Sequence, residues 1–308
     1  MFRFIVRRLI QMILVFVGTT FVVYALMFAA ASDPIQALVG ERPVSPQLRA
    51  DLTVRYHLDD PFIVQYLRYM GNLLRGDLGT QISGRPISQL MGQAWPYTLR
   101  LSALALLVVL LVGIGAGLVS AVRRGGVFDH ATLILTLVVI GIPVFVLGFN
   151  LQYLLGVKWK VLPVTVGADA GITAYLLPAV ILASITLATA VRLTRTSILE
   201  NLRADYVRTA NAKGLSRRRV IGVHVLRNSL IPVITFIGVT IGELMAGAVV
   251  TERIFNIPGI GYQLYQGIHL QDGPTVVGIV SVLVIVYLVS SLVVDLLYAV
   301  LDPRIRYE

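Results

Sequence analysis

The chain has 308 residues, of which 56% are hydrophobic and only 14% are charged, whereas soluble domains carry roughly a quarter charged residues. It contains no cysteine, which excludes disulfides and thiolate metal sites. The formal net charge of +10 would suit either nucleic-acid binding or basic loops on one face of a membrane, so the placement of the charges has to decide.

Six runs with at most one charge are each long enough to cross a hydrocarbon core as a helix, which takes about 20 residues. They are 9–32, 101–122, 131–157, 170–191, 228–251 and 273–294. Because lipid offers no partner for backbone amides, these runs are expected to be helical. The first run resembles a signal peptide, but the apolar region of such peptides is only about 7–15 residues long. We therefore expect a retained helix.

The basic residues predict the orientation of the chain. If the N-terminus is cytoplasmic, segments 1–8, 123–130, 192–227 and 302–308 lie inside and carry a net charge of +11, whereas the outer segments carry +1. This positive-inside asymmetry predicts that both termini are cytoplasmic. It also explains the basic charge without nucleic acid as a partner.

The predicted fold is therefore an all-α membrane protein with six transmembrane helices. Residues 1–30 form the N-terminal tail and first span, residues 31–98 an extracytoplasmic lobe, and residues 99–308 the core with the cytoplasmic segment 192–227 between the fourth and fifth spans. Within the spans, small residues are expected to be helix-packing notches and prolines to bend the helices. These are Gly113, Gly117 and Gly148, and Pro143 and Pro178.

Motifs for enzymatic chemistry are missing. A phosphate-binding loop needs Gly-Lys after a flexible glycine stretch, and none of the three lysines, Lys158, Lys160 and Lys213, follows a glycine. The His-Glu-x-x-His and Gly-x-Ser-x-Gly patterns are also absent from the sequence. We expect no catalytic residue, no metal and no cofactor bound by this chain.

The segment 192–227 is the longest and most basic cytoplasmic segment. Residues 203–213 read as a helix that ends at Gly214, and Ser216 can cap a second helix through Arg217–Arg227. The pattern predicts a bent helical pair just before the fifth span. The alternative is a basic, lipid-facing loop that only fixes topology.

Several motifs resemble one family. The run Asp205-Tyr-Val-Arg-Thr-Ala-Asn-Ala-Lys-Gly-Leu215 is similar to the coupling loop of ABC-importer permeases of the dipeptide, oligopeptide and nickel branch. Further matches to its B-type subunit are Arg7-Arg8-Leu9, Ser32-Asp33-Pro34, Gly76-Asp77-Leu78-Gly79, Arg192-Leu-Thr-Arg195-Thr-Ser197, Thr251-Glu-Arg-Ile-Phe255-Asn-Ile-Pro258-Gly259-Ile-Gly261, Asp295-Leu-Leu-Tyr298 and Asp302-Pro303-Arg304-Ile-Arg306. In the general Glu-Ala-Ala-x-x-x-Gly motif, Gly214 and Ala210 match, while Arg208 and Thr209 replace Glu and Ala.

The resemblance implies partners and a mechanism. Such a subunit pairs with a second homologous permease. The transporter has two cytoplasmic ATPase subunits or domains, and the coupling loop docks on them. Those partners bind ATP and Mg. An extracytoplasmic binding protein delivers the substrate, and the helices rock between inward-open and outward-open states. The expected location is the bacterial inner membrane, with lipid around the spans.

The resemblance also assigns candidate residues. Those that contact the ATPase are Asp205, Arg208, Thr209, Ala210, Lys213, Gly214 and Leu215; those at an outer gate are Phe255, Pro258, Gly259 and Tyr262. For the second group the alternative is a plain re-entrant connector. Glu243 is an acid inside the fifth span, where such groups are costly and are often functional. It either contacts a peptide amino group in the pathway, or is structural, bonded to a partner helix or kept neutral by burial.

The function predicted from the sequence is therefore that of a permease subunit in an ATP-driven, binding-protein-dependent importer for peptides or similar small solutes. The alternative is a self-contained, ion-coupled secondary transporter or channel, which would usually show internal repeats and buried ion-coupling groups. The sequence leaves the cargo open among dipeptides, oligopeptides, nickel chelates, haem-like molecules and glycans.

Overall fold

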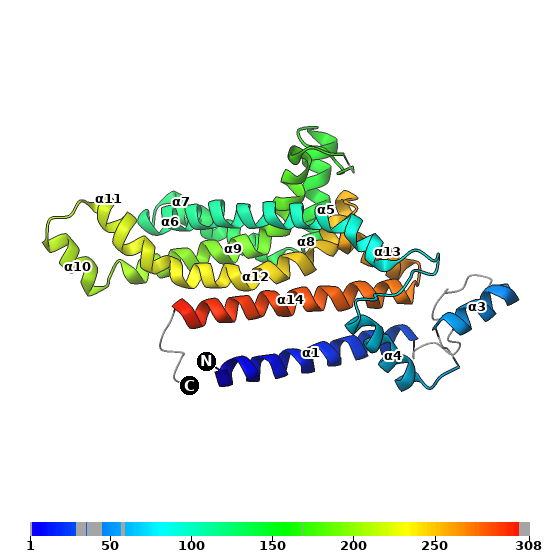
Figure 1. Ribbon diagram of the computed structural model, residues 1–308. Coiled ribbons are helices and arrows are strands. Elements are labelled where there is room, and N and C mark those ends of the chain that lie inside the picture. The colour runs from blue at the N-terminus through cyan, green and yellow to red at the C-terminus, as the bar shows by residue number, and fades with distance from the viewer. Residues whose placement is uncertain (1, 29–34, 36–44, 57–58, 168, 302–308) are drawn as a thin grey trace. The chain divides into compact units, whose positions relative to one another are not determined.

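The structure is a computed structural model that describes residues 2–28, 35, 45–56, 59–167 and 169–301. Among these residues every secondary-structure element longer than a single β-bridge is a helix (Figure 1). This confirms the all-α prediction. The motifs at Ser32-Asp33-Pro34 and in the C-terminal tail lie outside the described residues.

Five described helical segments are long and apolar enough to cross a membrane: Ile5–Phe28, Ile87–Val122, Ile172–Asn201, Arg217–Met245 and Gly273–Leu296. A sixth candidate is the broken pair Val127–Gly141 and Val144–Lys158, whose halves meet at 108°. The predicted count of six is reached only if this bent pair forms one span.

The chain divides into two compact units by its packing. The first comprises Met1–Thr98 and Pro258–Leu292, and the second comprises Leu99–Ile257 and Val293–Glu308.

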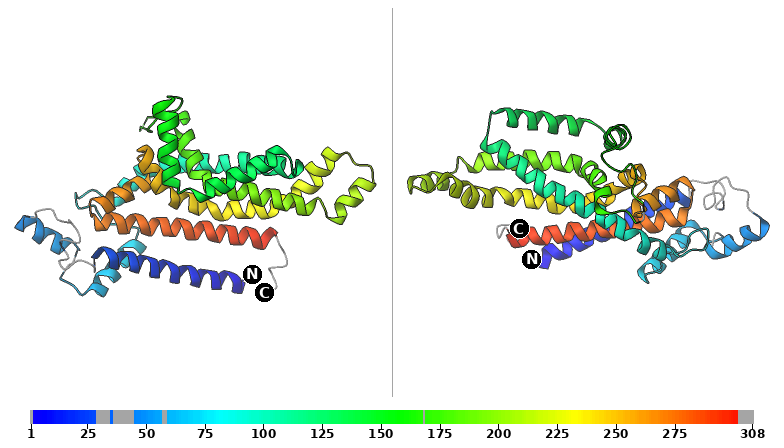
Figure 2. Two further views of the ribbon diagram at one scale, coloured as in Figure 1. Left: turned by 180° about the vertical axis from the view of Figure 1, so that it is seen from behind. Right: turned by 90° about the horizontal axis from the view of Figure 1, so that it is seen from above.

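In the first unit, α1 (Phe2–Phe28) runs beside α14 (Gly273–Leu301) in the opposite direction (Figures 1 and 2). Near the start of α1, Arg8 Nη2 donates to Ser291 Oγ at 2.7 Å. Near its end, Tyr24 packs with Val277 and with Tyr66 of α4 (Phe62–Leu74). Tyr66 and Leu73 are the buried side chains of α4. The unit also holds α3 (Pro46–Tyr56) and α13 (Ile260–His269).

The second unit is built around α9 (Leu176–Asn201). About two-thirds of the residues in the most apolar stretch of this span are buried. α9 packs against α6 (Ile114–Val122), α7 (Val127–Gly141), α8 (Val144–Leu151) and α12 (Leu226–Phe255). The remaining elements are α5 (Ile87–Val108), which begins in the first unit, η1 (Val109–Gly113), η2 (Gln152–Lys158) and η3 (Ile172–Tyr175).

Glycines allow the close approach of these helices, as predicted. A Cβ on Gly117 would lie 2.6 Å from Thr194 Cβ and 2.7 Å from the carbonyl oxygen of Val191, distances that side chains do not tolerate. A Cβ on Gly113 would lie 3.1 Å from Ala190 Cβ, and one on Gly148 would lie 2.9 Å from Ile254 Cδ1. Gly113, Gly117 and Gly148 are therefore packing notches against α9 and α12.

The two prolines behave differently. Pro143 lies in the break between α7 and α8 and ends the first half of the bent pair, as predicted. Pro178 is the third residue of α9, where a missing amide hydrogen removes no hydrogen bond within that helix. The bend predicted at Pro178 stays a prediction.

Candidate functional site

The bent helical pair predicted from the sequence is present. α10 (Asp205–Ala212) is followed by Lys213 and Gly214, and the φ of Gly214 is +74°. The short α11 (Arg217–Arg219) follows and leads through η4 (Val220–Val225) into α12. Figure 1 shows α10 and α11 at one end of the helices α9 and α12. We call residues 205–219 the coupling corner.

Backbone hydrogen bonds fix the angle of the coupling corner. The amide of Leu215 donates to the carbonyl of Ala210 at 3.3 Å, and the amide of Gly214 donates to the carbonyl of Asn211 at 2.9 Å. These two bonds with a left-handed glycine form a Schellman motif, a common helix ending. Ser216 has the extended backbone of a capping residue, but its side chain makes no capping hydrogen bond.

The inner side of the coupling corner is apolar. Val207 and Ala210 are buried in a cluster with Ala121, Ile198, Val220 and Val225, and Leu215 packs against that cluster. Ala210 and Leu215 were predicted to offer surface to a partner. Instead, Ala210 is buried and Leu215 is half-buried, because the tertiary packing turns this side of α10 toward the rest of the unit.

The outer side is polar and exposed. Asp205, Arg208, Thr209 and Lys213 are all exposed. Arg208 Nη1 lies 3.3 Å from Asp205 Oδ1, but both side chains are more than three-quarters exposed, so this pair adds little stability. The four side chains are therefore open to a partner that brings hydrogen bonds and opposite charge.

A buried ion pair lies at the base of the coupling corner. Arg195 of α9 donates from Nε to Asp129 Oδ1 at 2.6 Å and from Nη2 to Asp129 Oδ2 at 2.8 Å. Ser120 also donates to Asp129, and so does the amide of Gly125 at 2.9 Å. The carboxylate thus joins α6, the turn before α7 and α9.

A second tether joins α9 to α12. Ser197 Oγ donates to the carbonyl of Ser229 at 3.0 Å, and Ser229 Oγ donates back to the carbonyl of Ser197 at 3.3 Å. Both serines are buried. The two helices that carry the coupling corner are therefore fixed to each other and to the rest of the unit.

The sequence reasoning missed these tethers. It counted Asp129 only as a cytoplasmic charge and Arg195 only as part of a family motif. The signal was present: Asp129 is the only acid in segment 123–130, and Arg195 stands one turn of helix after an apolar span. The sequence did not show which of the many arginines would face that acid.

Glu243 lies on the exposed side of α12, and no hydrogen bond or ion pair joins its carboxylate to another described residue. Val239 and Val250, which are spaced to share its side of the helix, are also exposed. The described part of this chain therefore does not itself bury the carboxyl, and burial by a partner stays a prediction. A pathway role and a bond to a partner helix both stay predictions.

The predicted outer gate residues have different environments. Phe255 is fully buried in the second unit, and its carbonyl accepts the amide of Val166 at 2.9 Å. Its side chain therefore cannot meet a substrate in this state, contrary to the prediction. Asn256, with φ +52°, ends α12.

Pro258, Gly259 and Tyr262 belong to the first unit at the start of α13. Gly259 is the residue before this helix, and the amide of Ile260 donates to Thr98 Oγ1 at 2.8 Å. Pro258 and Tyr262 are half-buried, and the Tyr262 hydroxyl accepts a hydrogen bond from Gln266 Nε2 at 2.8 Å. This segment is a fixed helical turn.

Comparison with known proteins identifies the family. Residues 113–307 match the family described as the binding-protein-dependent transport system inner membrane component, and residues 1–95 match its N-terminal family. The chain belongs to this family. It is 38% identical to the dipeptide transport system permease protein DppB of Escherichia coli K12 and 40% identical to the di/tripeptide transport system permease protein DppB of Pseudomonas aeruginosa. It is 34% identical to the oligopeptide transport system permease protein AppB of Bacillus subtilis.

All three matches cover the whole of both chains. The resemblance to ABC-importer permeases that the sequence motifs indicated is therefore confirmed. As a binding-protein-dependent inner membrane component, the chain is a multi-pass bacterial inner-membrane protein and the permease part of a transporter that also has ATPase and substrate-binding components.

Proposed function

We propose that this inner-membrane component imports peptides or similar small solutes by alternating access, and that its coupling corner transmits the motion of partner ATPases to the spans. The observation that carries the proposal is the build of the corner. Its backbone is fixed by a Schellman motif, its inner side is buried, and its outer side is polar and exposed. A stiff element with an open polar side is suited to transmit force.

In this proposal the chain pairs with a second, homologous permease, and two cytoplasmic ATPase subunits or domains bind the ATP and Mg. Each ATPase receives one coupling corner in a cleft. Closure of the ATPase pair moves the corners, and the tethers at Arg195 and Ser197 carry that motion into α9, α7 and α12. An external binding protein delivers the substrate. This chain binds no cofactor of its own.

The cargo class rests on the relatives. Their names specify dipeptide, di/tripeptide and oligopeptide transport, and the similarity extends over whole chains. We therefore place short peptides ahead of nickel chelates, haem-like molecules and glycans.

Two further residue groups belong to the proposal. Glu243 is exposed on an apolar span, which supports a role outside this chain, either in the pathway or against the second permease. Pro258, Gly259 and Tyr262 form the proposed outer gate, supported by their place at the start of α13, where the Ile260 amide is bonded to Thr98 Oγ1. Phe255 is left out because it is buried.

The test is reconstitution in liposomes. The chain together with its second permease, ATPases and binding protein is expected to take up a labelled dipeptide only when ATP is supplied to the ATPase side. The chain alone is expected to hydrolyse no ATP and to transport nothing. Uptake by the chain alone under a proton or sodium gradient would instead identify a secondary transporter.

A further inference from the structure

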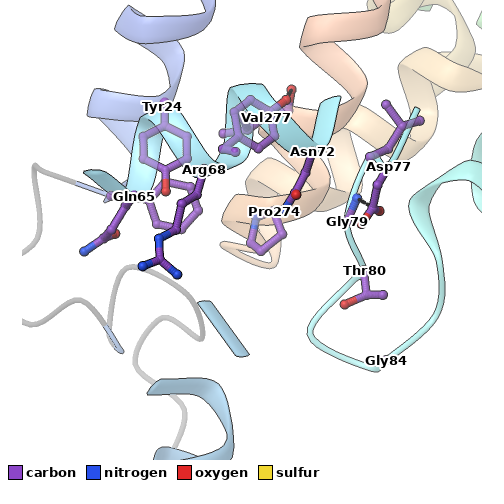
Figure 3. Close-up of a pocket in the computed structure, with 13 residues that line it drawn as sticks. Tyr24, Gln65, Arg68, Asn72, Asp77, Gly79, Thr80, Gly84, Pro274 and Val277 are labelled. Atoms are coloured by element: carbon purple, nitrogen blue, oxygen red, sulfur yellow. Dashed lines mark hydrogen bonds between the residues drawn. The ribbon is translucent and has the colours of Figure 1, made fainter. Parts of the chain in front are cut away.

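A cavity of about 390 Å³ lies in the first unit. The end of α1, one side of α4, the loop after α4 and the start of α14 form its walls (Figure 3). Binding sites for small molecules typically measure about 300–1,000 Å³ and combine an apolar lining with a few polar groups. The lining of this cavity has both.

The apolar wall is aromatic. The rings of Tyr24 and Phe28 have their centroids 4.5 Å apart, and those of Tyr24 and Tyr69 are 5.4 Å apart. The Tyr69 hydroxyl is engaged with Ser281 Oγ at 2.7 Å, and burial raises the pKa of Tyr69 to about 12. This wall therefore presents ring surface to the cavity.

The polar part of the lining carries two opposite charges on different segments. Arg68 comes from α4 and Asp77 from the loop that follows it, and Figure 3 shows them at opposite sides of the pocket with Asn72 and Pro274 between them. A ligand that satisfies both charges must itself carry a positive and a negative group.

Both charged groups keep capacity for a ligand. Asp77 Oδ1 accepts the amide of Gly79 at 2.8 Å, which orients the carboxylate, and no described residue bonds its second oxygen. Arg68 Nη2 lies 3.1 Å from Asp60 Oδ2, which holds the guanidinium. A guanidinium has five donors, so this pairing leaves others for a ligand.

We propose that this cavity binds a short peptide as a zwitterion, with its ammonium group beside Asp77, its carboxylate beside Arg68 and an apolar side chain on the aromatic wall. The paired charges define the zwitterion, and its identification as a peptide rests on the proposed cargo. The gap between the charges holds Asn72, whose amide can bond the peptide group. The permease would then hold its cargo at a site of its own, separate from the binding protein.

The experiment measures binding to the full-length chain in phosphatidylcholine nanodiscs by calorimetry, with alanyl-phenylalanine as the probe. N-acetylation or C-terminal amidation of the probe is expected to raise its Kd about tenfold, because each change removes one charge-assisted interaction. Asp77→Asn is expected to raise the Kd of the free dipeptide by a similar factor but not that of the acetylated one. Arg68→Gln is expected to affect the free dipeptide but not the amide.

Matched controls are Asp59→Asn and Arg75→Gln, which make the same charge changes on exposed residues of the same segment that do not line the cavity. Both should bind like the unaltered chain. Asp77→Asn keeps an oxygen that can accept the Gly79 amide, so the loop should stay folded.

The proposal is overturned if the unaltered chain does not bind the dipeptide, or if Arg68→Gln and Asp77→Asn bind it as the controls do. It is also overturned if phosphatidylethanolamine added to the nanodiscs displaces the dipeptide in an Arg68-dependent way, because the cavity is then a lipid headgroup site. The assay contains no ATPase or binding protein. A failure of ATP-driven uptake therefore leaves its result unaffected, and the two proposals fail separately.

Discussion

Asp129 and Arg195 are 66 residues apart in the chain and form a two-bond ion pair in which the carboxylate is almost fully buried, with 2% of its side chain exposed. The pair joins the first turn of α7 to α9, the helix that leads into the coupling corner. A buried charge that loses its partner is strongly destabilising, whereas replacement of both charges by apolar groups is often tolerated.

Removal of the carboxylate charge is therefore expected to be costly. Asp129→Asn should lower the free energy of unfolding by about 3 kcal/mol, since it leaves the Arg195 guanidinium without its counter-charge. Thermal unfolding of the purified protein in detergent measures this. The exposed pair at Asp205 and Arg208 supplies the control, and Asp205→Asn should unfold like the original chain.

A double variant separates the ion pair from simple packing. Asp129→Leu combined with Arg195→Met should be more stable than Asp129→Asn alone, because no buried charge is left unpaired. The exposed Gly125 amide can bond to water instead. If the double variant is less stable than the single one, the interpretation of Asp129 as an ion-pair partner is wrong.

Two glycines of α6, Gly117 and Gly115, are predicted to respond differently to replacement by alanine. Gly117→Ala should impair folding or assembly, because its Cβ would lie 2.6 Å from Thr194 Cβ and 2.7 Å from a backbone oxygen. Gly115→Ala, two residues earlier in the same helix, meets nothing within 4 Å and should be neutral or slightly stabilising. The yield of monodisperse protein after purification reports both, and equal yields would contradict the notch.

Local features of this fold were predictable and long-range ones were not. The corner at Gly214 follows from a helix, a glycine and a serine in succession, all within a few residues. Ala210 was predicted to contact the ATPase and Phe255 to lie at the outer gate, but both side chains are buried. These predictions failed because which side of a helix is buried depends on helices distant in sequence. The partner of Asp129 was missed for the same reason: the chain has 23 arginines, and only the packing of α7 on α9 selects one.

The orientation predicted from the arginines can be tested directly. A cysteine introduced at Ser216, an exposed residue of the coupling corner, should react only with reagents that enter the cytoplasm. One at Ser45, exposed at the start of α3, should react with impermeant reagents from outside. Since the chain has no cysteine of its own, no background labelling is expected. The reverse pattern would invert the topology.

Replacement of Glu243 can distinguish a role in the transport pathway from a role in assembly with the second permease. If its carboxylate faces the pathway, Glu243→Gln should change uptake of cationic peptides while the complex still assembles. If it bonds the second permease, the same change should weaken assembly for every cargo alike. Val239→Gln, a polar change on the same exposed stripe, is the control for lipid contact. Wild-type uptake and assembly would remove Glu243 from both roles.

The sharpest test of the coupling role is at Gly214. Its φ of +74° lies in the left-handed region, where a side chain costs about 1 kcal/mol and a β-branched one costs more. No atom lies within 4 Å of a Cβ at this position, so the cost is one of backbone conformation and not of a clash. Gly214→Val should therefore change the angle of the coupling corner without disturbing any span.

We expect the Gly214→Val chain to insert and to pair with its second permease, but to bind its ATPases weakly, so that substrate-stimulated ATP hydrolysis and uptake are lost together. Gly214→Ala should show the same defect in milder form. Gly222→Val is the control, because Gly222 is an exposed glycine of the next helical segment, η4, and does not have a positive φ. A basic loop that only fixes topology would tolerate all three changes, since none alters a charge. Full ATPase binding and wild-type uptake by the Gly214→Val complex would therefore refute the coupling assignment.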